Sequence, residues 1–430
     1  MEKILINDIQ HNLKGELTVP GDKSISHRAI MLGSISHGIT EIDNFLMGED
    51  CIATINAFRK MGVEIKEQGS KVIVGGVGLH GLKEPSGIID AKNSGTTTRL
   101  ISGILAGQPF ESTITGDDSL KKRPMKRVID PLSKMGAKFL SIDEDYHIPF
   151  TISGGNLKGF SYETSVPSAQ VKSAILLAGL YADCPTTVIE PSPSRDHSEL
   201  MLEYFGALIK RHSPTEVSIK PNPRLMGQHI IVSGDISSAA YFMVAGLITE
   251  GSDILIKDVN INPTRSGIIR VIEAMDGNIS LSDIRKVSNE DVADIHVAYS
   301  PNMHGTTISG DIIPTLIDEI PIIAVLSAFA NGKTIVKDAA ELKVKESNRI
   351  DTIVNGLTNM GANIKATNDG FVINGGDLLF GAKIETKKDH RIAMAFAVAN
   401  LICKGSVILD DEECVNISFP GFFKTLESLI

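Results

Sequence analysis

The chain has 430 residues, about three times the usual size of one domain, so two or three domains are expected. Its formal charge is −10 and no long basic run offsets it, which argues against nucleic acid as a partner. Tryptophan is absent and aromatic residues make up only 5%, so the ligand should be polar rather than held in an aromatic pocket.

Cysteine spacing and hydropathy indicate a reduced, cytoplasmic protein. The four cysteines show no CxxC spacing, and the histidines show no ligand spacing, so neither a disulfide framework nor a metal site is predicted. Asn7 and Asp8 interrupt the N-terminal apolar residues where a secretory signal needs a continuous run. The longest apolar run, Ile320 to Ala330, is too short to cross a bilayer. We therefore expect a soluble protein without a membrane partner.

One pattern recurs along the chain with a period of about 70 residues. A phrase typical of a helix end, FRKMGVEI in its first copy, returns as LSKMGAKF, EYFGALIK, IEAMDGNI and LTNMGANI, and FFKTLESLI supplies a sixth. A small-residue turn and a β-branched run accompany each copy: GITEI, ESTITG, PTTVIE, GSDILI, GKTIVK and GSVILD. The chain is therefore interpreted as six copies of one mixed unit.

Each copy begins with a polar phrase that leads into an apolar helix. In chain order, these helices begin near Asp22, Asn93, Pro167, Gly234, Asp318 and Asp389. Their sequences are apolar nearly all round, which is typical of buried helices rather than surface ones. A short strand, a loop and an extended segment precede each helix, so every copy combines strands and helices.

The two ends of the chain are predicted to be neighbours. The sixth copy lacks the following strand pair, whereas the N-terminus opens with an unmatched pair, ILIN and GELTVPG, so residues 1 to about 20 should close it. Grouped three and three, the copies predict two similar α/β domains, one spanning 21–233 and the other combining 1–20 with 234–430. A doubly wound sheet is not predicted, because no GxGxxG follows a first strand.

The polar phrases stand at helix N-termini, where unpaired N–H groups and the helix dipole favour anions. If these starts face one cleft between the domains, an acidic protein could hold a multiply anionic ligand there. A single Lys or Arg at a helix start is usually a solvated or capping side chain, so it is the recurrence that favours a function. The cations and polar residues concerned include Lys23, Ser24, Arg28, Gly95, Ser168, Gln170, Lys172, His390 and Arg391, with Arg123 in KKRPMKR and Lys345 and Arg349 in ELKVKESNR.

Asp318 and Glu346 are acids in this otherwise cationic set. Both stand before or at the start of a helix, where an acid is favourable, so a structural role is open. The alternative is that a site for anions keeps an acid only to move a proton. His390, between Asp389 and Arg391, is either a proton shuttle or an orienting hydrogen-bond partner, and the second is favoured.

Several phrases together resemble one enzyme family. VPGDKSISHRAIMLGSISHGIT and KVKESNRIDTIVNGLTNMGA resemble the two signatures of the 5-enolpyruvylshikimate-3-phosphate synthase family, and NSGTTTR, PSAQVKSA, SRDHSE, IDEIP and DHRIAMAF match in the same order. PSAQVKS and RDH look like the second class of these enzymes. The resemblance covers essentially the whole chain. It implies two domains, each of three βαβαββ units with three buried parallel helices, in an inside-out α/β fold with the active site in the interdomain cleft.

The resemblance implies transfer of the enolpyruvyl group of phosphoenolpyruvate to the 5-hydroxyl of 3-phosphoshikimate. Phosphate is released by addition–elimination, without a cofactor or a metal, in the shikimate pathway to chorismate and the aromatic amino acids. We expect a cytoplasmic monomer with these two small-molecule substrates. The herbicide glyphosate competes with phosphoenolpyruvate in this family, and Gly95 in place of alanine predicts room for it.

The resemblance also implies a role for each matched residue. The implied catalytic residues are Asp318, Glu346 and Lys23. Asp318 would accept the proton of the 5-hydroxyl, Glu346 would donate a proton to the methylene carbon, and Lys345 would lie near the shikimate hydroxyls. The residues implied to hold shikimate 3-phosphate, mainly on the first domain, are Lys23, Ser24, Arg28, Ser168, Gln170 and Arg195. Those implied to hold phosphoenolpyruvate are Lys23, Gly95, Arg123, Gln170, Arg349 and Arg391, and His390 completes the substrate-binding set.

Two positions depart from the better-known branch of the family. Ala169 follows Ser168 where that branch has a second serine, and Ile417 stands where it has a lysine. One alternative is the sister transferase that acts on UDP-N-acetylglucosamine, but its mobile-loop cysteine has no counterpart in TGDDSLKKRPMKR. The other is a non-catalytic anion-binding protein on the same scaffold, which would have no use for Asp318 and Glu346.

Overall fold

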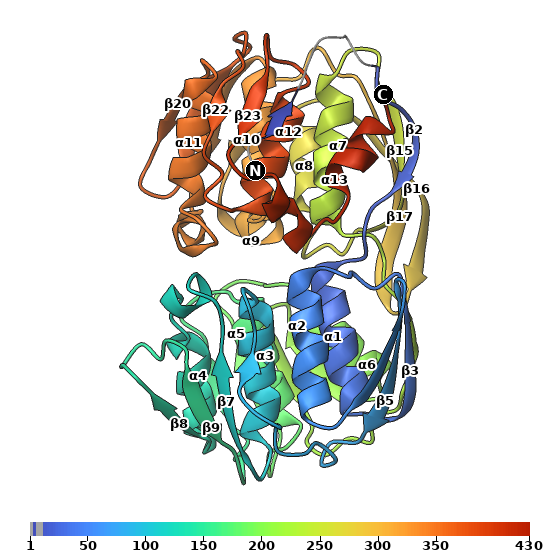
Figure 1. The fold of residues 1–430 in the computed structure, drawn as a ribbon, viewed down its shortest axis with the longest axis vertical. Coiled ribbons are helices and arrows are strands. Elements are labelled where there is room, and N and C mark those ends of the chain that lie inside the picture. The colour runs from blue at the N-terminus through green and yellow to red at the C-terminus, as the bar shows by residue number, and fades with distance from the viewer. Residues whose placement is uncertain (1–2, 6–11) are drawn as a thin grey trace. The chain divides into compact units, whose positions relative to one another are not determined.

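The structure is a computed structural model that describes residues 3–5 and 12–430. It is a mixed α/β chain with several small mixed sheets (Figure 1). The described chain divides into two compact units. Unit 1 comprises the described residues up to Pro20 together with Ser233–Lys286 and Asp291–Ile430, and unit 2 comprises Gly21–Val232 and Val287–Glu290.

Unit 2 contains three four-stranded sheets with one pairing pattern, in the orders β14-β3-β5-β4, β6-β7-β9-β8 and β10-β11-β13-β12. In each sheet the first pairing is parallel and the other two are antiparallel. The strands are β3 (His37–Asp43), β4 (Glu64–Gln68), β5 (Lys71–Val77), β6 (Ile89–Asp90), β7 (Glu111–Thr115), β8 (Lys138–Ser141), β9 (Phe150–Ser153), β10 (Ser161–Glu163), β11 (Thr186–Ile189), β12 (Ile209–Ser213), β13 (Glu216–Ile219) and β14 (His229–Ile231).

The described residues of unit 1 form two four-stranded sheets and one three-stranded sheet, in the orders β16-β17-β15-β2, β18-β19-β21-β20 and β1-β23-β22. The parallel pairings are β2 with β15, β18 with β19, and β22 with β23. The strands are β1 (Lys3–Leu5), β2 (Lys14–Thr18), β15 (Asp253–Asn260), β16 (Asn278–Val287), β17 (Glu290–Ala298), β18 (Thr307–Ile308), β19 (Gly332–Val336), β20 (Asn363–Ala366), β21 (Phe371–Gly375), β22 (Lys383–Ile384) and β23 (Val407–Leu409).

The N-terminal segment contributes to two sheets rather than one. Strand β1 pairs with β23, and the backbone N–H of Lys14 donates to the carbonyl of Leu429 at 3.0 Å, so the two ends are neighbours here. The prediction that residues 1 to about 20 close the sixth copy is wrong for β2, which pairs with β15 of the fourth copy. That pairing buries Leu17 and Val19 in the core of unit 1. Residues 6–11 of the predicted closing segment lie outside the described residues.

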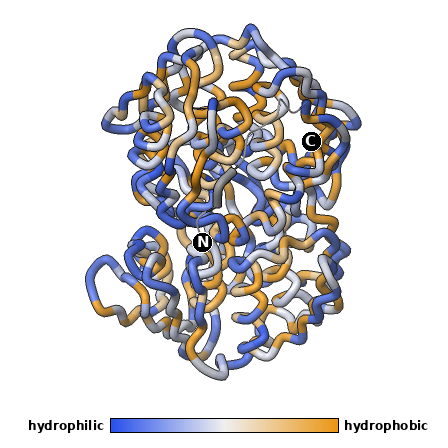
Figure 2. The backbone as a smooth tube through the Cα atoms, turned by 45° about the horizontal axis from the view of Figure 1, so that its top comes forward, coloured by the Kyte–Doolittle hydropathy of each residue, from blue (hydrophilic) through white to orange (hydrophobic). Residues whose placement is uncertain are grey.

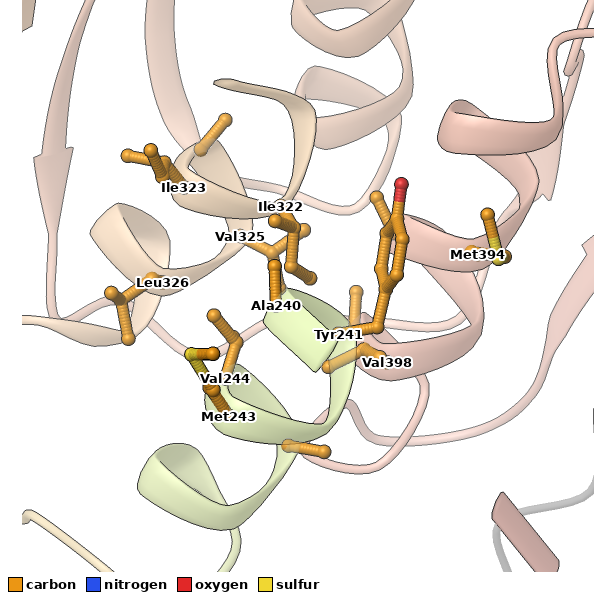
Figure 3. Close-up of a cluster of buried hydrophobic side chains, with 14 of the residues drawn as sticks. Ala240, Tyr241, Met243, Val244, Ile322, Ile323, Val325, Leu326, Met394 and Val398 are labelled. Atoms are coloured by element: carbon orange, nitrogen blue, oxygen red, sulfur yellow. The ribbon is translucent and has the colours of Figure 1, made fainter. Parts of the chain in front are cut away.

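Six of the described helices are buried along most of their length, as their apolar sequences predict. They are α1 (Lys23–Ser34), α3 (Gly95–Ala106) and α5 (Ala169–Gly179) in unit 2, and α7 (Ile236–Ile248), α10 (Ile320–Phe329) and α12 (His390–Ala399) in unit 1. In unit 1, α7, α10 and α12 contact one another. Figure 3 shows the side chains that meet between them, among them Tyr241 and Val244 of α7, Ile322 and Val325 of α10, and Met394 and Val398 of α12.

The other described helices and 3-10 turns are separate elements that are less completely buried than these six. They are α2 (Glu49–Lys60), α4 (Lys126–Met135), α6 (His197–Tyr204), α8 (Gly267–Ala274), α9 (Ile313–Leu316), α11 (Arg349–Asn359), α13 (Phe422–Glu427), η1 (Leu120–Lys122), η2 (Gly310–Ile312), η3 (Ala340–Val344) and η4 (Glu413–Ile417). Apolar and hydrophilic stretches alternate along the chain (Figure 2), and each unit buries its own hydrophobic core.

None of the helices in the described part of the chain is, taken singly, both long and apolar enough to cross a membrane. The helical segments Gly310–Leu316 and Ile320–Phe329 are bent by 110° relative to each other, and they reach the required length and apolar composition only when counted together.

Polar side chains cap the starts of most of the buried helices and so fix where those starts lie. Asp22 accepts from the backbone N–H of the third residue after it at 2.9 Å, and Ser94 does so at 3.1 Å. Asp235 and Asp389 accept from the second residue after them at 2.8 and 3.0 Å. Because each cap belongs to one of the polar phrases, those phrases stand at the helix N-termini.

Candidate active site

Arg349, the first residue of α11, lies at the centre of a buried ion cluster in unit 1. We use that name for Asp318, Lys345, Glu346, Arg349 and Asp389. The Arg349 side chain is 1% exposed, and its Nε donates to Asp389 Oδ2 at 2.9 Å. Its Nη1 donates to Asp318 Oδ1 at 3.2 Å and its Nη2 to Glu346 Oε2 at 2.5 Å. One guanidinium therefore holds three carboxylates.

Arg349 and Asp389 form a fixed pair of opposite charges within the ion cluster. Burial alone would lower the pKa of Arg349, but the charges of Asp389, Glu346 and Asp318 outweigh burial and raise it. Burial alone would raise the pKa of Asp389, but Arg349 outweighs burial and holds that pKa below the usual range of an aspartate. The Asp389 carboxylate also caps α12 and accepts from Ser347 Oγ at 3.0 Å. It is therefore a permanent structural anion.

Asp318 and Glu346 differ from Asp389 in being reachable from solvent. The side chain of Asp318 is 12% exposed and that of Glu346 is 21% exposed, whereas the side chain of Asp389 is 0% exposed. Lys345 Nζ donates to Asp318 Oδ1 at 3.3 Å. Both accessible carboxylates therefore share one guanidinium with the wholly buried Asp389.

Arg391 and His390 stand at the start of α12, beside the ion cluster. Arg391 Nη1 donates to the backbone carbonyl of Asp318 at 3.2 Å, and its pKa is raised because nearby Asp318 outweighs the effect of burial. His390 is buried, and its charge contributes to lowering the pKa of Asp389. Tyr241, from the apolar core in Figure 3, donates to the carbonyl of Arg391 at 3.5 Å, which joins the core to the site.

Sequence reasoning missed Arg265, which lies just before α8 and is buried. Its Nη2 donates to Asp235 Oδ1 at 3.0 Å and to Ser237 Oγ at 2.8 Å, and its Nη1 lies 3.8 Å from Asp318 Oδ2. Ser237 in turn donates to Glu319. The position of Asp235 at a predicted helix start could have indicated it, as could the likeness of NPTRS around Arg265 to SPSRD around Arg195 in the preceding copy.

In unit 2, the guanidinium of Arg28 on α1 donates hydrogen bonds from all three of its nitrogen atoms. Its Nε donates to Ser198 Oγ at 2.6 Å, its Nη2 to Ser173 Oγ at 3.0 Å, and its Nη1 to the carbonyl of Ser24 at 2.9 Å. Burial lowers the pKa of Arg28 to about 10, and the like charge of Arg195 contributes in the same direction. Arg195 therefore lies close enough to act on Arg28.

Two arginines crowd the start of α3 in unit 2. A Cβ added to Gly95 would stand 2.7 Å from Arg99 Nη1 and 3.6 Å from Arg123 Nη1. Arg99 Nη1 donates to Gln170 Oε1 at 2.8 Å, and Arg123 Nη2 donates to Asn93 Oδ1 at 2.9 Å. A side chain at Gly95 would therefore displace the end of Arg99, whereas Arg123 Nη1 would remain in ordinary contact with it. Arg99 is not among the residues predicted for the site.

The other predicted residues of unit 2 lie at the starts of α1 and α5. Lys23 Nζ donates to Asp50 Oδ2 at 3.0 Å. Ser168 caps α5, and its own backbone N–H donates to Glu190 Oε1 at 3.0 Å. Of the two positions that depart from the better-known branch, Ala169 is the first residue of α5 and Ile417 is the last residue of η4.

The predicted site residues therefore fall into two sets, one in each unit. Unit 1 brings Asp318, Lys345, Glu346, Arg349, His390 and Arg391 together around the ion cluster. Unit 2 holds Lys23, Ser24, Gly95, Ser168 and Gln170 at the starts of its buried helices, Arg28 in the second turn of α1, Arg123 beside the start of α3, and Arg195 just before α6.

Comparison with known proteins gives one consistent family. The model of the EPSP synthase (3-phosphoshikimate 1-carboxyvinyltransferase) family matches residues 7–426. A 3-phosphoshikimate 1-carboxyvinyltransferase from Thermoanaerobacter sp. (strain X514) is 55% identical over 417 residues, which are 97% of this chain and 98% of that protein. One from Desulforamulus reducens is 52% identical over 429 residues, 100% of this chain and 99% of that protein. The solved EPSP synthase of Acinetobacter baumannii has a TM-score of 0.90 and 44% identity, covering 100% of this chain and 98% of that one.

Proposed function

The chain belongs to the EPSP synthase family, and we propose that the ion cluster of unit 1 performs the proton transfers of the family's reaction. The chain is a 3-phosphoshikimate 1-carboxyvinyltransferase. It transfers the enolpyruvyl group of phosphoenolpyruvate to 3-phosphoshikimate and releases phosphate, a step of the shikimate pathway.

One observation carries the assignment of the acid and base. Three carboxylates bind Arg349, but only Asp318 and Glu346 keep exposed surface, at 12% and 21%. Asp389 is wholly buried and its pKa is held low, so it stays an anion and serves the structure. A group that exchanges protons with a substrate must be reachable by that substrate, which leaves Asp318 and Glu346.

The proposed chemistry is addition followed by elimination. Asp318 takes the proton of the 5-hydroxyl as that oxygen bonds to C2 of phosphoenolpyruvate, while Glu346 gives a proton to the C3 methylene. The resulting tetrahedral intermediate carries both the phosphate and the new ether. A proton then passes from the methyl carbon to the Glu346 carboxylate as the C2–O bond to phosphate breaks, and Asp318 gives up its proton to the released phosphate. The vinyl group and both side chains are thereby restored, and no cofactor is consumed. Lys345 lies beside Asp318 and is assigned to the shikimate hydroxyls.

The cationic residues have the task of holding two anions that repel each other. We assign mainly 3-phosphoshikimate to unit 2, through Lys23, Ser24, Arg28, Ser168, Gln170 and Arg195. We assign phosphoenolpyruvate to Arg349, Arg391 and His390 of unit 1, with Lys23, Gly95, Gln170 and Arg123 of unit 2. Helix N-termini and arginine forks favour carboxylate and phosphate, which supports both assignments.

We also infer that the chain consists of six copies of one βαβαββ repeat. Unit 1 and unit 2 would each contain three of these copies and three buried parallel helices. The support is the repeated strand order. Five sheets begin with a parallel pair, β14-β3, β6-β7, β10-β11, β2-β15 and β18-β19, and each continues with a hairpin from the same copy. The sixth sheet has the parallel pair β22-β23 and takes β1 from the other end of the chain.

Phosphate release tests the assignment of the acceptor. The purified protein is given phosphoenolpyruvate with 3-phosphoshikimate, with UDP-N-acetylglucosamine, or with neither. We expect release only with 3-phosphoshikimate. Release with UDP-N-acetylglucosamine would transfer the assignment to the sister enzyme, and calorimetric binding of both anions without release would favour a non-catalytic binding protein.

A further inference from the structure

We propose that Lys172 of α5 is a positioning residue that holds Ser168 and Arg28 in place for 3-phosphoshikimate. This inference rests on the roles proposed above for Ser168 and Arg28. Lys172 does not reach the ligand itself, because its side chain is 5% exposed and its ammonium group is surrounded by protein acceptors.

Three acceptors occupy the three N–H bonds of the Lys172 ammonium group. Nζ lies 2.9 Å from Glu190 Oε2 and 2.8 Å from Glu199 Oε1, and it donates to the carbonyl of Ser194 at 3.3 Å. Burial alone would lower the pKa of Lys172, but the two glutamates outweigh burial and raise it. The ammonium therefore stays charged and its donors are fully used.

The first connection runs from Lys172 through Glu190 to Ser168. Glu190 directly follows β11, and its side chain is 2% exposed. One carboxylate oxygen binds Lys172 while the other accepts the backbone N–H of Ser168 at 3.0 Å. Lys172 thus fixes Glu190, and Glu190 fixes the residue that caps α5. Because Ala169 follows Ser168, this chain has one serine where the better-known branch has two. The orientation of Ser168 therefore matters more for binding the substrate.

The second connection runs from Lys172 through α6 to Arg28. Glu199, which binds Lys172, follows Ser198 in the first turn of α6, and Ser198 Oγ accepts from Arg28 Nε at 2.6 Å. Ser173, next to Lys172 on α5, accepts from Arg28 Nη2 at 3.0 Å. The Oγ atoms of Ser173 and Ser198 lie 2.5 Å apart. The Lys172–Glu199 contact therefore keeps together the two hydroxyls that orient the Arg28 guanidinium.

The charges explain why a lysine is needed at this position. Without Lys172, the buried carboxylates of Glu190 and Glu199 would lose their counter-charge, and Glu199 already attracts the Arg28 guanidinium. Glu199 would then attract the Arg28 guanidinium away from the ligand. Glu190 would hold the cap residue Ser168 less firmly. The expected defect is weaker capture of one substrate, whereas a salt bridge with only a structural role would lower stability and leave the affinities of the folded protein unchanged.

The experiment compares Lys172→Met, Glu190→Gln and Ser198→Ala with the matched control Ser102→Ala. Ser102 is a buried serine whose hydroxyl donates to the carbonyl of Thr98 in its own helix. Calorimetry gives the Kd of 3-phosphoshikimate, and initial rates of phosphate release give kcat and both KM values. Ser198→Ala and Glu190→Gln keep both buried cations, Lys172 and Arg28. They therefore still test the proposal if Lys172→Met fails to fold.

We expect the Kd for 3-phosphoshikimate to rise about 10-fold in Ser198→Ala and more in Lys172→Met. The KM for phosphoenolpyruvate should stay unchanged, and Ser102→Ala should match the wild type. Unchanged 3-phosphoshikimate affinity in the folded variants, or an equal rise in both KM values, would overturn the proposal.

Arg28→Lys, measured in parallel, separates this inference from the assignment on which it rests. If Arg28→Lys binds 3-phosphoshikimate normally, the role of Arg28 fails, and the role of Lys172 fails with it. If Arg28→Lys binds weakly while Ser198→Ala and Lys172→Met bind normally, only the positioning role is overturned.

Discussion

Replacing Asp318 by asparagine separates a catalytic base from a carboxylate that only stabilises the fold. Asparagine has the same shape and keeps an oxygen that can accept from Arg349 Nη1, which lies 3.2 Å from the carboxylate, and from Lys345 Nζ at 3.3 Å. The substitution removes the negative charge and the ability to take a proton. The fold should therefore survive while the reaction slows.

The structure sets the size of both effects. Loss of a general base costs about 10² to 10⁴ in rate, or about 3–5 kcal/mol in the barrier. The cost in stability should be smaller, about 1–2 kcal/mol, because Arg349 keeps Asp389 at 2.9 Å and Glu346 at 2.5 Å. Lys345 is 29% exposed and can recover hydration. The loss of rate should therefore far exceed the unfolded fraction.

The assay combines kcat for phosphate release, thermal unfolding, and calorimetric binding of 3-phosphoshikimate. Asp351→Asn is the matched control, since Asp351 is an exposed acid in the first turn of α11 outside the ion cluster. We expect Asp318→Asn to stay folded at 25 °C, to bind 3-phosphoshikimate, and to lose at least about 100-fold in kcat. A kcat within about 10-fold of the wild type, or an equal loss in Asp351→Asn, would refute the role of Asp318 as a base.

Three further substitutions test other parts of the structure. Gly95→Ala places a Cβ 2.7 Å from Arg99 Nη1, so the KM for phosphoenolpyruvate and the inhibition constant of glyphosate should both rise about 10-fold; unchanged initial-rate kinetics would contradict this. Asp389→Asn keeps the helix cap but loses the charge bound to Arg349. Because the pKa of Asp389 is lowered in the folded protein, the unfolded chain takes up the proton first as the pH falls. The stabilisation is present above the pKa of the unfolded chain and is lost as the pH falls through the lowered pKa of the folded protein. Asp389→Asn should therefore unfold at a lower urea concentration at pH 7, and its stability should depend less on acid; parallel acid dependence would contradict this. Gly356→Ala would bring a Cβ within 2.1 Å of a phenylalanine ring of α12 and should destabilise unit 1 by about 1–3 kcal/mol, and a Tm equal to that of the wild type would contradict it.

The starts of the buried helices could be predicted from the sequence because the signals are local. Asp22 and Asp389 are polar caps followed by a few polar residues and then by apolar runs, and the structure starts α1 and α12 at the residue after each cap. A cation or hydroxyl recurs at the same place in the repeat, which is the basis for predicting anion binding at these starts.

The buried contact between Asp389 and Arg349 could not be predicted, because these residues lie far apart in the sequence. Asp389 meets Arg349 across 40 positions of the sequence, and that contact makes it the buried structural anion. Arg265 meets Asp235 across 30 positions. Strand β2 pairs with β15 in the sheet of the fourth copy and not with a strand of the sixth copy. The repeat pattern indicates that a strand is missing from the sixth copy, but it does not indicate which sheet the N-terminal strand joins. Such pairings follow from tertiary packing and leave no periodic signal.

The fate of hydrogen at the methylene carbon tests the acid–base role of the ion cluster most directly. In D₂O, a proton donor at Glu346 that exchanges with solvent should deliver deuterium to C3 of phosphoenolpyruvate, and elimination should leave part of it in the vinyl group of the product. We expect deuterium in that group by NMR for the wild type, and a rate of product formation at least about 100-fold lower for Glu346→Gln. A vinyl group without deuterium, formed in D₂O at the wild-type rate, would contradict addition–elimination and the role of Glu346.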